Sequence, residues 1–152
     1  MDELDVRQES TRPKMTPDEV QTLIKGYYRP CVPPDERYPA DDCERIERYF
    51  RCSIPAEFRA LRSLLPHHSV EGDHMPADEM EITYEFECEH NPNFTRDHLP
   101  FYCVGNGDLI CLSILACPYS PVLYVAHDDP EVSVLAPNFE TFLLDKDWFC
   151  RP

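Results

Sequence analysis

Basic residues are scarce in this sequence. Lys and Arg total 14 against 29 Asp and Glu, which gives a formal net charge of −15. Proteins bind nucleic-acid phosphates through Lys and Arg, so this balance argues against a nucleic-acid partner and favours a cationic one. An acidic excess can also serve solubility alone, and that alternative stays open.

The sequence also lacks a C-x-x-C motif, an N-terminal signal peptide and any apolar run near about 18 residues. Its eight cysteines are scattered over positions 31, 43, 52, 88, 103, 111, 117 and 150. Several of them fall in predicted strands or helix faces, where a free thiol behaves as a small hydrophobic group. We therefore expect a cytoplasmic protein with reduced cysteines, without a membrane span or a membrane partner.

The length of 152 residues suits one domain with a core of its own. Residues 1–15 are polar and of mixed charge, so we expect a mobile arm there. Residues 16–152 are predicted to form a single domain.

The most strongly specified stretch is 99–115, where two apolar runs flank Gly105-Asn106-Gly107-Asp108. Asn-Gly tolerates positive φ at both central positions of a tight turn, so the stretch predicts a β-hairpin with Val104 opposite Leu109. In that register one face carries Phe101, Cys103, Ile110, Leu112 and Ile114, and the other carries Tyr102, Val104, Leu109 and Cys111. Both faces are apolar, which predicts a hairpin covered on both sides, and Cys103 and Cys111 should not pair.

Four helices are predicted from apolar spacing and capping signals. The first begins at the capping box Thr16-Pro-Asp-Glu19 and ends at Lys25-Gly26. The second begins at the acidic residue Asp41 and carries Cys43, Ile46, Tyr49 and Phe50 on its apolar face. The third runs from Pro55 to Leu65. The fourth runs from Phe139 to Leu144, with Asn138 as its N-cap.

Residues 80–89 alternate between apolar side chains at 82, 84, 86 and 88 and polar ones at 81, 83, 85, 87 and 89. This period predicts a strand with one buried face and one face of carboxylates. Further strands are predicted at 122–125 and 132–135. The segregated order gives an α+β fold: a mostly antiparallel sheet of four to six strands, two or three N-terminal helices and one C-terminal helix.

In this order and spacing the pieces resemble the SUKH superfamily, which unites a fungal cell-wall-synthesis regulator with many bacterial immunity proteins. The resemblance covers 41–144. It rests on Cys43-Glu-Arg-Ile-Glu-Arg-Tyr-Phe50, Ile54-Pro-Ala-Glu-Phe58, the 99–108 hairpin, Pro121-Val-Leu-Tyr-Val125 with His127-Asp128, and 135–143. Where the family usually carries an Asn-Gly element after the second of these helices, this chain has 65–72 instead.

The resemblance implies a non-catalytic domain that binds proteins, commonly a cognate toxin that it neutralises. We therefore expect an immunity-type protein, monomeric or weakly dimeric, with a basic toxin as partner, for which a nuclease is one candidate. One alternative is a regulatory protein-binding scaffold. Another is a metal-dependent enzyme that uses Cys and His residues.

The charge pattern indicates where a basic partner would bind. Between 71 and 89 there are eight acidic residues and no Lys or Arg, which gives candidate partner-binding residues Glu71, Asp73, Asp78, Glu79, Glu81, Glu85 and Glu87. The competing interpretation is a solvated edge strand protected by its charge.

Two possible chemical sites are weak on sequence grounds. No Lys or Arg follows Gly105-Asn106-Gly107-Asp108 and no helix opens there, so this segment is interpreted as a structural turn, with Asp108 bonding nearby backbone, and not a phosphate loop. Cys88, His90, His67, His68 and His74 match no zinc-ligand spacing. We expect no catalytic residues, no metal and no cofactor.

Overall fold

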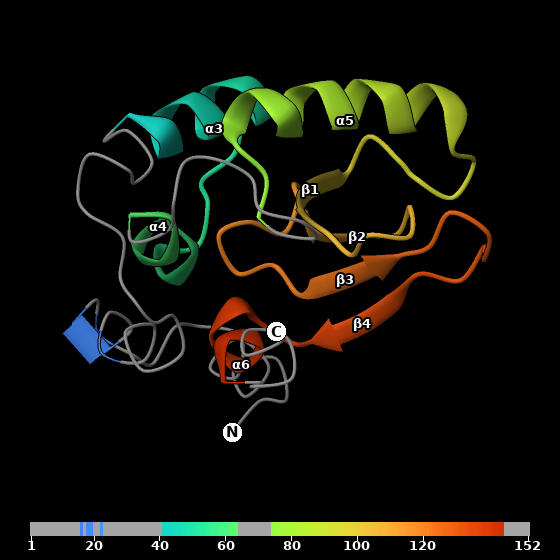
Figure 1. Cartoon of the computed structure of the whole chain (residues 1–152). Coiled ribbons are helices and arrows are strands. Elements are labelled where there is room, and N and C mark those ends of the chain that lie inside the picture. Colours follow the sequence, from blue (N-terminus) through green and yellow to red (C-terminus); the bar gives the residue numbers. More distant parts are fainter. Residues whose placement is uncertain (1–15, 17, 20–21, 23–40, 64–73, 145–152) are drawn as a thin grey trace.

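The computed structural model of the chain describes residues 16, 18–19, 22, 41–63 and 74–144 (Figure 1). In chain order the elements are α3 (Asp42–Phe50), α4 (Ala56–Arg62), α5 (Ala77–His90), β1 (His98–Cys103), β2 (Leu109–Ser113), β3 (Val122–Val125), β4 (Ser133–Ala136) and α6 (Phe139–Leu143). The strands form one 4-stranded antiparallel sheet in the order β1-β2-β3-β4. The predicted α+β class is confirmed, with a strand number inside the expected range.

Near the N-terminus, the backbone N–H of Glu19 donates to Thr16 Oγ1 at 3.2 Å, which is the hydrogen bond expected of the predicted capping box. Residues 18, 19 and 22 are helical. The expected end of that helix at Lys25-Gly26 and the expected arm over 1–15 lie outside the described residues.

Helices α3 and α4 form where the sequence predicts them. Helix α3 buries Cys43, Ile46 and Phe50, while Tyr49, predicted for the same stripe, stays 38% exposed at its edge. Pro55 is the N-cap of α4, which buries Phe58 and Leu61. Its predicted continuation through 64–66 lies outside the described residues.

A buried ion pair joins α3 to α4. Nε of Arg62 lies 2.5 Å from Oδ2 of Asp42, and Nη2 lies 3.2 Å from Oδ1, with both side chains almost fully buried. Arg62 Nη1 also donates to the carbonyl of Met75 at 2.9 Å. The guanidinium therefore ties both helices to the chain that leads into α5.

The predicted strand over 80–89 is wrong, because these residues belong to α5. Ala77, Met80 and Tyr84 are buried at spacings of three and four, as a helix requires. The apolar residues at 82 and 86 lie on the opposite side of this helix and are exposed. Apolar side chains on two helix faces therefore produced an alternation that imitates a strand.

The predicted hairpin forms from β1 and β2, but its register differs from the prediction by one residue at Tyr102 and Cys103 and by two residues from His98 to Pro100. Leu109 lies opposite Cys103 and not Val104, and an irregularity between Pro100 and Tyr102 accommodates Phe101. The predicted face assignment of β1 is therefore wrong, since Tyr102 lies opposite Ile110. The expectation of cover on both faces is confirmed, because Leu109 to Leu112 are consecutive and all buried.

The register shift places Cys103 on the side of the hairpin that carries Leu109 and Cys111, contrary to prediction. Cys103 and Cys111 are nevertheless free thiols. The other described cysteines, Cys43, Cys52, Cys88 and Cys117, are free as well.

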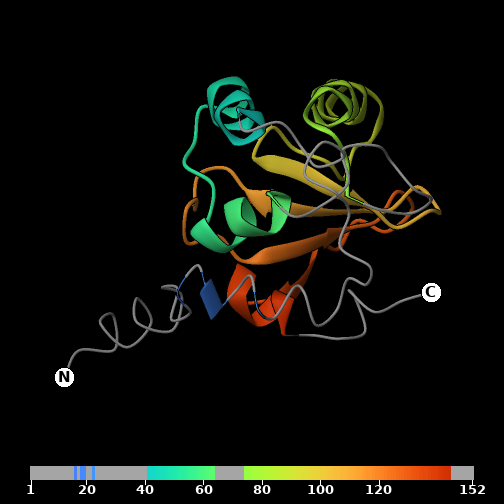
Figure 2. The same cartoon turned by 60° about the vertical axis from the view of Figure 1, so that its left-hand side comes forward.

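The helices lie in two groups (Figures 1 and 2). Helices α3 and α5 run side by side next to β1, whereas α4 and α6 contact each other. Phe58 of α4 and Phe139 of α6 pack edge-on against Phe101 of β1, with ring centroids 5.4 and 5.7 Å away. Asn138 caps α6 as predicted, since its Oδ1 accepts from the backbone N–H of Thr141 at 2.7 Å.

Candidate functional site

The acidic residues predicted to bind a partner differ in exposure, because those that the structure describes lie on different sides of helix α5. Asp78 and Glu79 occupy the exposed first turn of α5, while Glu81 and Glu87 are half-buried and Glu85 is exposed. Glu71 and Asp73 lie outside the described residues. The predicted single face of carboxylates is therefore wrong, because a helix distributes these positions around its axis.

Two of these carboxylates bind neighbouring elements. Glu81 Oε2 accepts from Arg45 Nε of α3 at 2.6 Å. Glu85 accepts from the hydroxyl of Tyr49 at 2.8 Å and lies 3.6 Å from Arg96. Glu81 and Glu85 thus join α5 to α3 and to the segment after α5, and part of their charge is neutralised within the molecule.

Most of the remaining charge of α5 faces outward, on Asp78, Glu79 and Glu89, whereas Glu87 is half-buried. Among the described residues no cation pairs with Asp78, Glu79, Glu87 or Glu89. Between these carboxylates the helix exposes Ile82 and Phe86, at 68% and 56% of their surface. Sequence reasoning assigned both residues to a buried face, so this exposed apolar pair was missed. The helical spacing of Ala77, Met80 and Tyr84 was the signal that could have revealed it.

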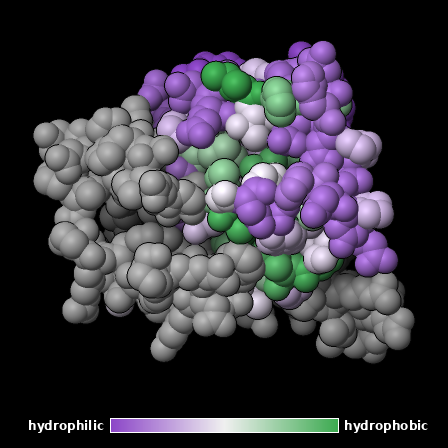
Figure 3. Space-filling view, turned by 45° about the vertical axis from the view of Figure 1, so that its right-hand side comes forward, coloured by the Kyte–Doolittle hydropathy of each residue, from purple (hydrophilic) through white to green (hydrophobic). Residues whose placement is uncertain are grey.

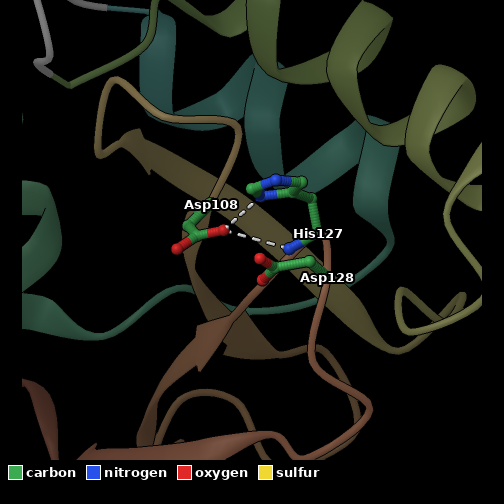
Figure 4. Close-up of side chains that lie close together, drawn as sticks. All are labelled: Asp108, His127 and Asp128. Carbon is green, nitrogen blue, oxygen red and sulfur yellow. Dashed lines mark hydrogen bonds and ion pairs between the residues drawn. The ribbon is translucent and has the colours of Figure 1, made fainter.

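A second group of polar side chains lies where the hairpin turn meets the end of β3 (Figure 4). Asp108 Oδ1 accepts from the backbone N–H of His127 at 3.0 Å and lies 2.7 Å from its Nδ1. Asp108 Oδ2 accepts from the hydroxyl of Tyr124 at 2.5 Å. The carboxylate therefore joins the β1–β2 turn to β3. Its partners lie 16 and 19 residues farther along the chain, whereas the sequence predicts hydrogen bonds to the nearby backbone.

The geometry of the turn explains its glycines. Gly105 and Gly107 have φ of +103° and +95°, whereas Asn106 does not have positive φ, contrary to the predicted turn. Asn106 Oδ1 instead accepts from the backbone N–H of Asp108 at 3.0 Å. A Cβ on Gly107 would lie 3.2 Å from Nδ1 of His127, so this glycine also makes room for the histidine ring.

Hydrogen bonding sets the protonation of this pair. Burial raises the pKa of Asp108, but the hydrogen bonds from Tyr124 and His127 outweigh burial and hold the pKa at about 2. The hydrogen bond to Asp108 raises the pKa of His127 above its usual value. The pair is therefore an ion pair over a wide range of mildly acidic pH.

Asp108, His127 and Asp128 are the one group of potential metal ligands within 4.8 Å of one another among the described residues. Both oxygens of Asp108 already accept hydrogen bonds, and Nδ1 of His127 faces that same carboxylate. This donor set fits a structural hydrogen-bonded cluster better than a metal centre, in which the carboxylate and imidazole lone pairs would point to the ion.

The described cysteine and histidine residues considered for a metal site do not form a cluster of three potential ligands. His74 is buried against Phe101 and Tyr102, and burial, with a smaller effect of the Arg62 charge, lowers its pKa to about 3. Cys88 is half-buried in α5, and His90 ends that helix. His67 and His68 lie outside the described residues.

A family model described as the SMI1 / KNR4 family (SUKH-1) matches residues 39–145. The chain belongs to this family. The match extends from just before α3 to just past α6 and agrees with the resemblance to the SUKH superfamily over 41–144. No curated protein matches the chain at a significant level.

Membership in the SUKH-1 family is consistent with a domain of the immunity or regulatory type, in a family whose members are generally non-catalytic. It implies that the protein interacts with a protein partner. In the part of the chain that the structure describes, no helix has the length and apolarity needed to cross a bilayer.

Proposed function

We propose that this SUKH-1 protein is a non-catalytic, cytoplasmic immunity-type protein that binds and neutralises a cognate basic toxin, with a nuclease as one candidate. The observation that carries the proposal is family membership combined with a net charge of −15. A nuclease binds the phosphates of its substrate through basic residues, so an acidic protein can occupy the same groove.

Helix α5 is the described element best suited to that contact. Asp78, Glu79 and Glu89 are exposed and have no cation paired with them among the described residues. Complementary charge of this kind raises the association rate and orients the partner more than it raises the final affinity. This supports a binding role without requiring any catalytic group.

The test uses the full-length chain and a catalytically inactive form of a toxin-like protein encoded next to its gene. We expect a stoichiometric complex by size-exclusion chromatography and calorimetry at low salt, and rescue of cells that produce the active toxin. A lysozyme-sized basic protein of unrelated origin serves as the control for non-specific charge attraction. Absence of binding to every neighbouring toxin at low salt would contradict the proposal.

A regulatory scaffold is the second candidate, because the SUKH-1 family includes domains of that type. The same experiment separates the two, since a scaffold would bind a host protein and would not rescue cells from a toxin. A metal-dependent enzyme would instead require a stoichiometric metal ion, which elemental analysis of the purified protein detects. We do not favour the enzyme, because the described Cys and His candidates are not gathered in one place.

A further inference from the structure

Helix α5 is apolar on two opposite sides. Its inner side, with Ala77, Met80 and Tyr84, is buried. At 100° per residue, Ile82 and Phe86 fall almost opposite that side, one turn apart and adjacent on the surface. A helix that packs on one side typically carries charged or polar residues at these positions, so the packing of the described residues does not account for Ile82 and Phe86.

The surroundings of the pair are anionic. Asp78, Glu79 and Glu89 flank it on the exposed surface, and Glu85 lies beside it. Two described arginines, Arg45 and Arg96, interact with Glu81 and Glu85. Figure 3 shows apolar side chains at the top of the molecule, where α3 and α5 lie in Figure 1, with hydrophilic side chains on both sides.

The aromatic ring of Phe86 is supported from its own helix. The centroid of the His90 ring lies 4.3 Å from that of Phe86, with an interplanar angle of 57°. This contact limits the freedom of Phe86 before binding, which reduces the entropy lost when a partner immobilises it. An aromatic anchor held in this way beside an aliphatic one is typical of the centre of an interface.

We propose that the outer face of α5 is the docking surface for the basic partner, with Ile82 and Phe86 as anchors inserted into an apolar groove bordered by Lys and Arg. This inference rests on the proposed function and adds to it the surface and the chemistry of the partner. Anchors one turn apart match the way an amphipathic helix binds in a groove, and the surrounding carboxylates match a basic border.

Charge complementarity selects this occupant over two others. A second copy of the chain would bring one ring of carboxylates against another, and like charges in contact disfavour association. An anionic membrane surface would repel the same carboxylates. A basic protein is the occupant for which both the apolar centre and the charged border of the surface are favourable.

The test compares two variants of the full chain in calorimetric titrations with the inactive neighbouring toxin. Ile82→Gln/Phe86→Gln removes both anchors and leaves every charge in place. Leu115→Gln changes a side chain that is 88% exposed in the connection after β2, and is the matched control. We expect binding about 30-fold weaker for the double variant, the loss typical of interface anchors, and unchanged binding for the control.

Melting temperatures establish that both variants fold, which exposed positions should allow. Unchanged affinity of the folded double variant would overturn the docking surface and leave the proposed function standing. Failure of the wild-type chain to bind any neighbouring toxin would overturn both. Self-association of the wild-type chain that the double variant abolishes would show that a second copy occupies this face, and would also overturn the proposal.

Discussion

Arg62 and Asp42 are charged residues inside the core. Their mutual attraction and hydrogen bonds offset the free-energy cost of removing both charges from water. The guanidinium makes two hydrogen bonds to the carboxylate and one to the carbonyl of Met75. An Arg62→Ala variant would leave Asp42 buried without this partner. We expect a loss of about 3–5 kcal/mol in the free energy of unfolding, measured by urea denaturation.

The matched control for that measurement is Asp42→Leu/Arg62→Met, which removes both charges and restores much of the volume. It should be more stable than either single replacement, because no uncompensated charge remains in the core. Single variants as stable as the wild-type protein would contradict the interpretation that the pair is buried and mutually dependent.

The Asp108–His127 pair makes stability depend on pH in a direction that can be worked out. The pKa of His127 is raised, so its contribution is complete below its ordinary value of 6.5 and falls as the pH rises through the raised pKa. The pKa of Asp108 is lowered from 3.8 to about 2, so its contribution is complete above 3.8 and is lost as the pH falls towards 2.

We therefore expect Asp108→Asn to destabilise the protein more at about pH 5.5 than at about pH 9. In the variant the pKa of His127, followed by NMR, should fall towards 6.5. The control introduces Asp108→Asn into a His127→Gln background, where no imidazole titrates, so Asp108→Asn should there cost the same stability at both pH values. An equal loss of stability at both pH values would show that the positive charge of His127 adds nothing to the contact.

The Asp108–His127 contact was within reach of the sequence once the strands were paired. Strand β2 begins at Leu109, which lies opposite Val125 near the end of β3, so the next residues of both segments meet. The turn residues Gly105 to Asp108 taken alone predict only hydrogen bonds to the local backbone. A contact that depends on the register of β2 against β3 is not visible in the pattern of either segment alone.

At the scale of the element, α5 shows why period alone can mislead. Ile82, Tyr84, Phe86 and Cys88 alternate with polar residues, yet only Tyr84 among them is buried. The composition of 77–90, with Ala, Met and five Glu, favours a helix, and 14 residues exceed an ordinary strand. The outward apolar pair, which local folding does not require, supplied the false signal.

The carboxylates of α5 should separate into two groups when they are neutralised. Asp78→Asn/Glu79→Gln/Glu89→Gln removes outward charges, and we expect roughly three- to tenfold weaker binding of the toxin with little change in melting temperature. Glu81→Gln/Glu85→Gln removes the negative charges that accept from Arg45 and Tyr49, and should lower the melting temperature with a smaller effect on binding.

Calorimetric titration and thermal unfolding of both variants distinguish the two groups. The opposite result, with strong loss of binding only on neutralising Glu81 and Glu85, would move the contact surface to the side of α5 that faces α3.

At the scale of the molecule, the order of helices and strands was predictable because most elements obey one dominant rule. Helix α3 has a single apolar stripe, α6 has an N-cap that makes its expected hydrogen bond, and β2 is apolar from Leu109 to Leu112 because both faces are covered there. Prediction failed where two demands act on the same residues. Helix α5 carries apolar residues both towards the core and on its outer surface. Strand β1 pairs with β2 and also contains the irregularity at Phe101, which shifts the pairing.

The division between charge and apolar anchors leads to a kinetic prediction for the whole protein. With a net charge of −15, attraction to a basic toxin acts at long range and is screened by salt, whose screening length falls from about 10 Å at 0.1 M to about 3 Å at 1 M. The association rate should therefore fall by about tenfold or more over this range. The dissociation rate should change much less, because it depends on the burial of Ile82 and Phe86.

Stopped-flow association and dissociation experiments on the wild-type chain and Ile82→Gln/Phe86→Gln would test both parts. The double variant keeps every charge, so it should associate with the same salt dependence but dissociate faster. A wild-type association rate that is insensitive to salt would refute the electrostatic contribution while leaving the partnership intact. A double variant that associates slowly but dissociates at the wild-type rate would place the anchors in the encounter step, which exposed apolar side chains with no net charge are not expected to control.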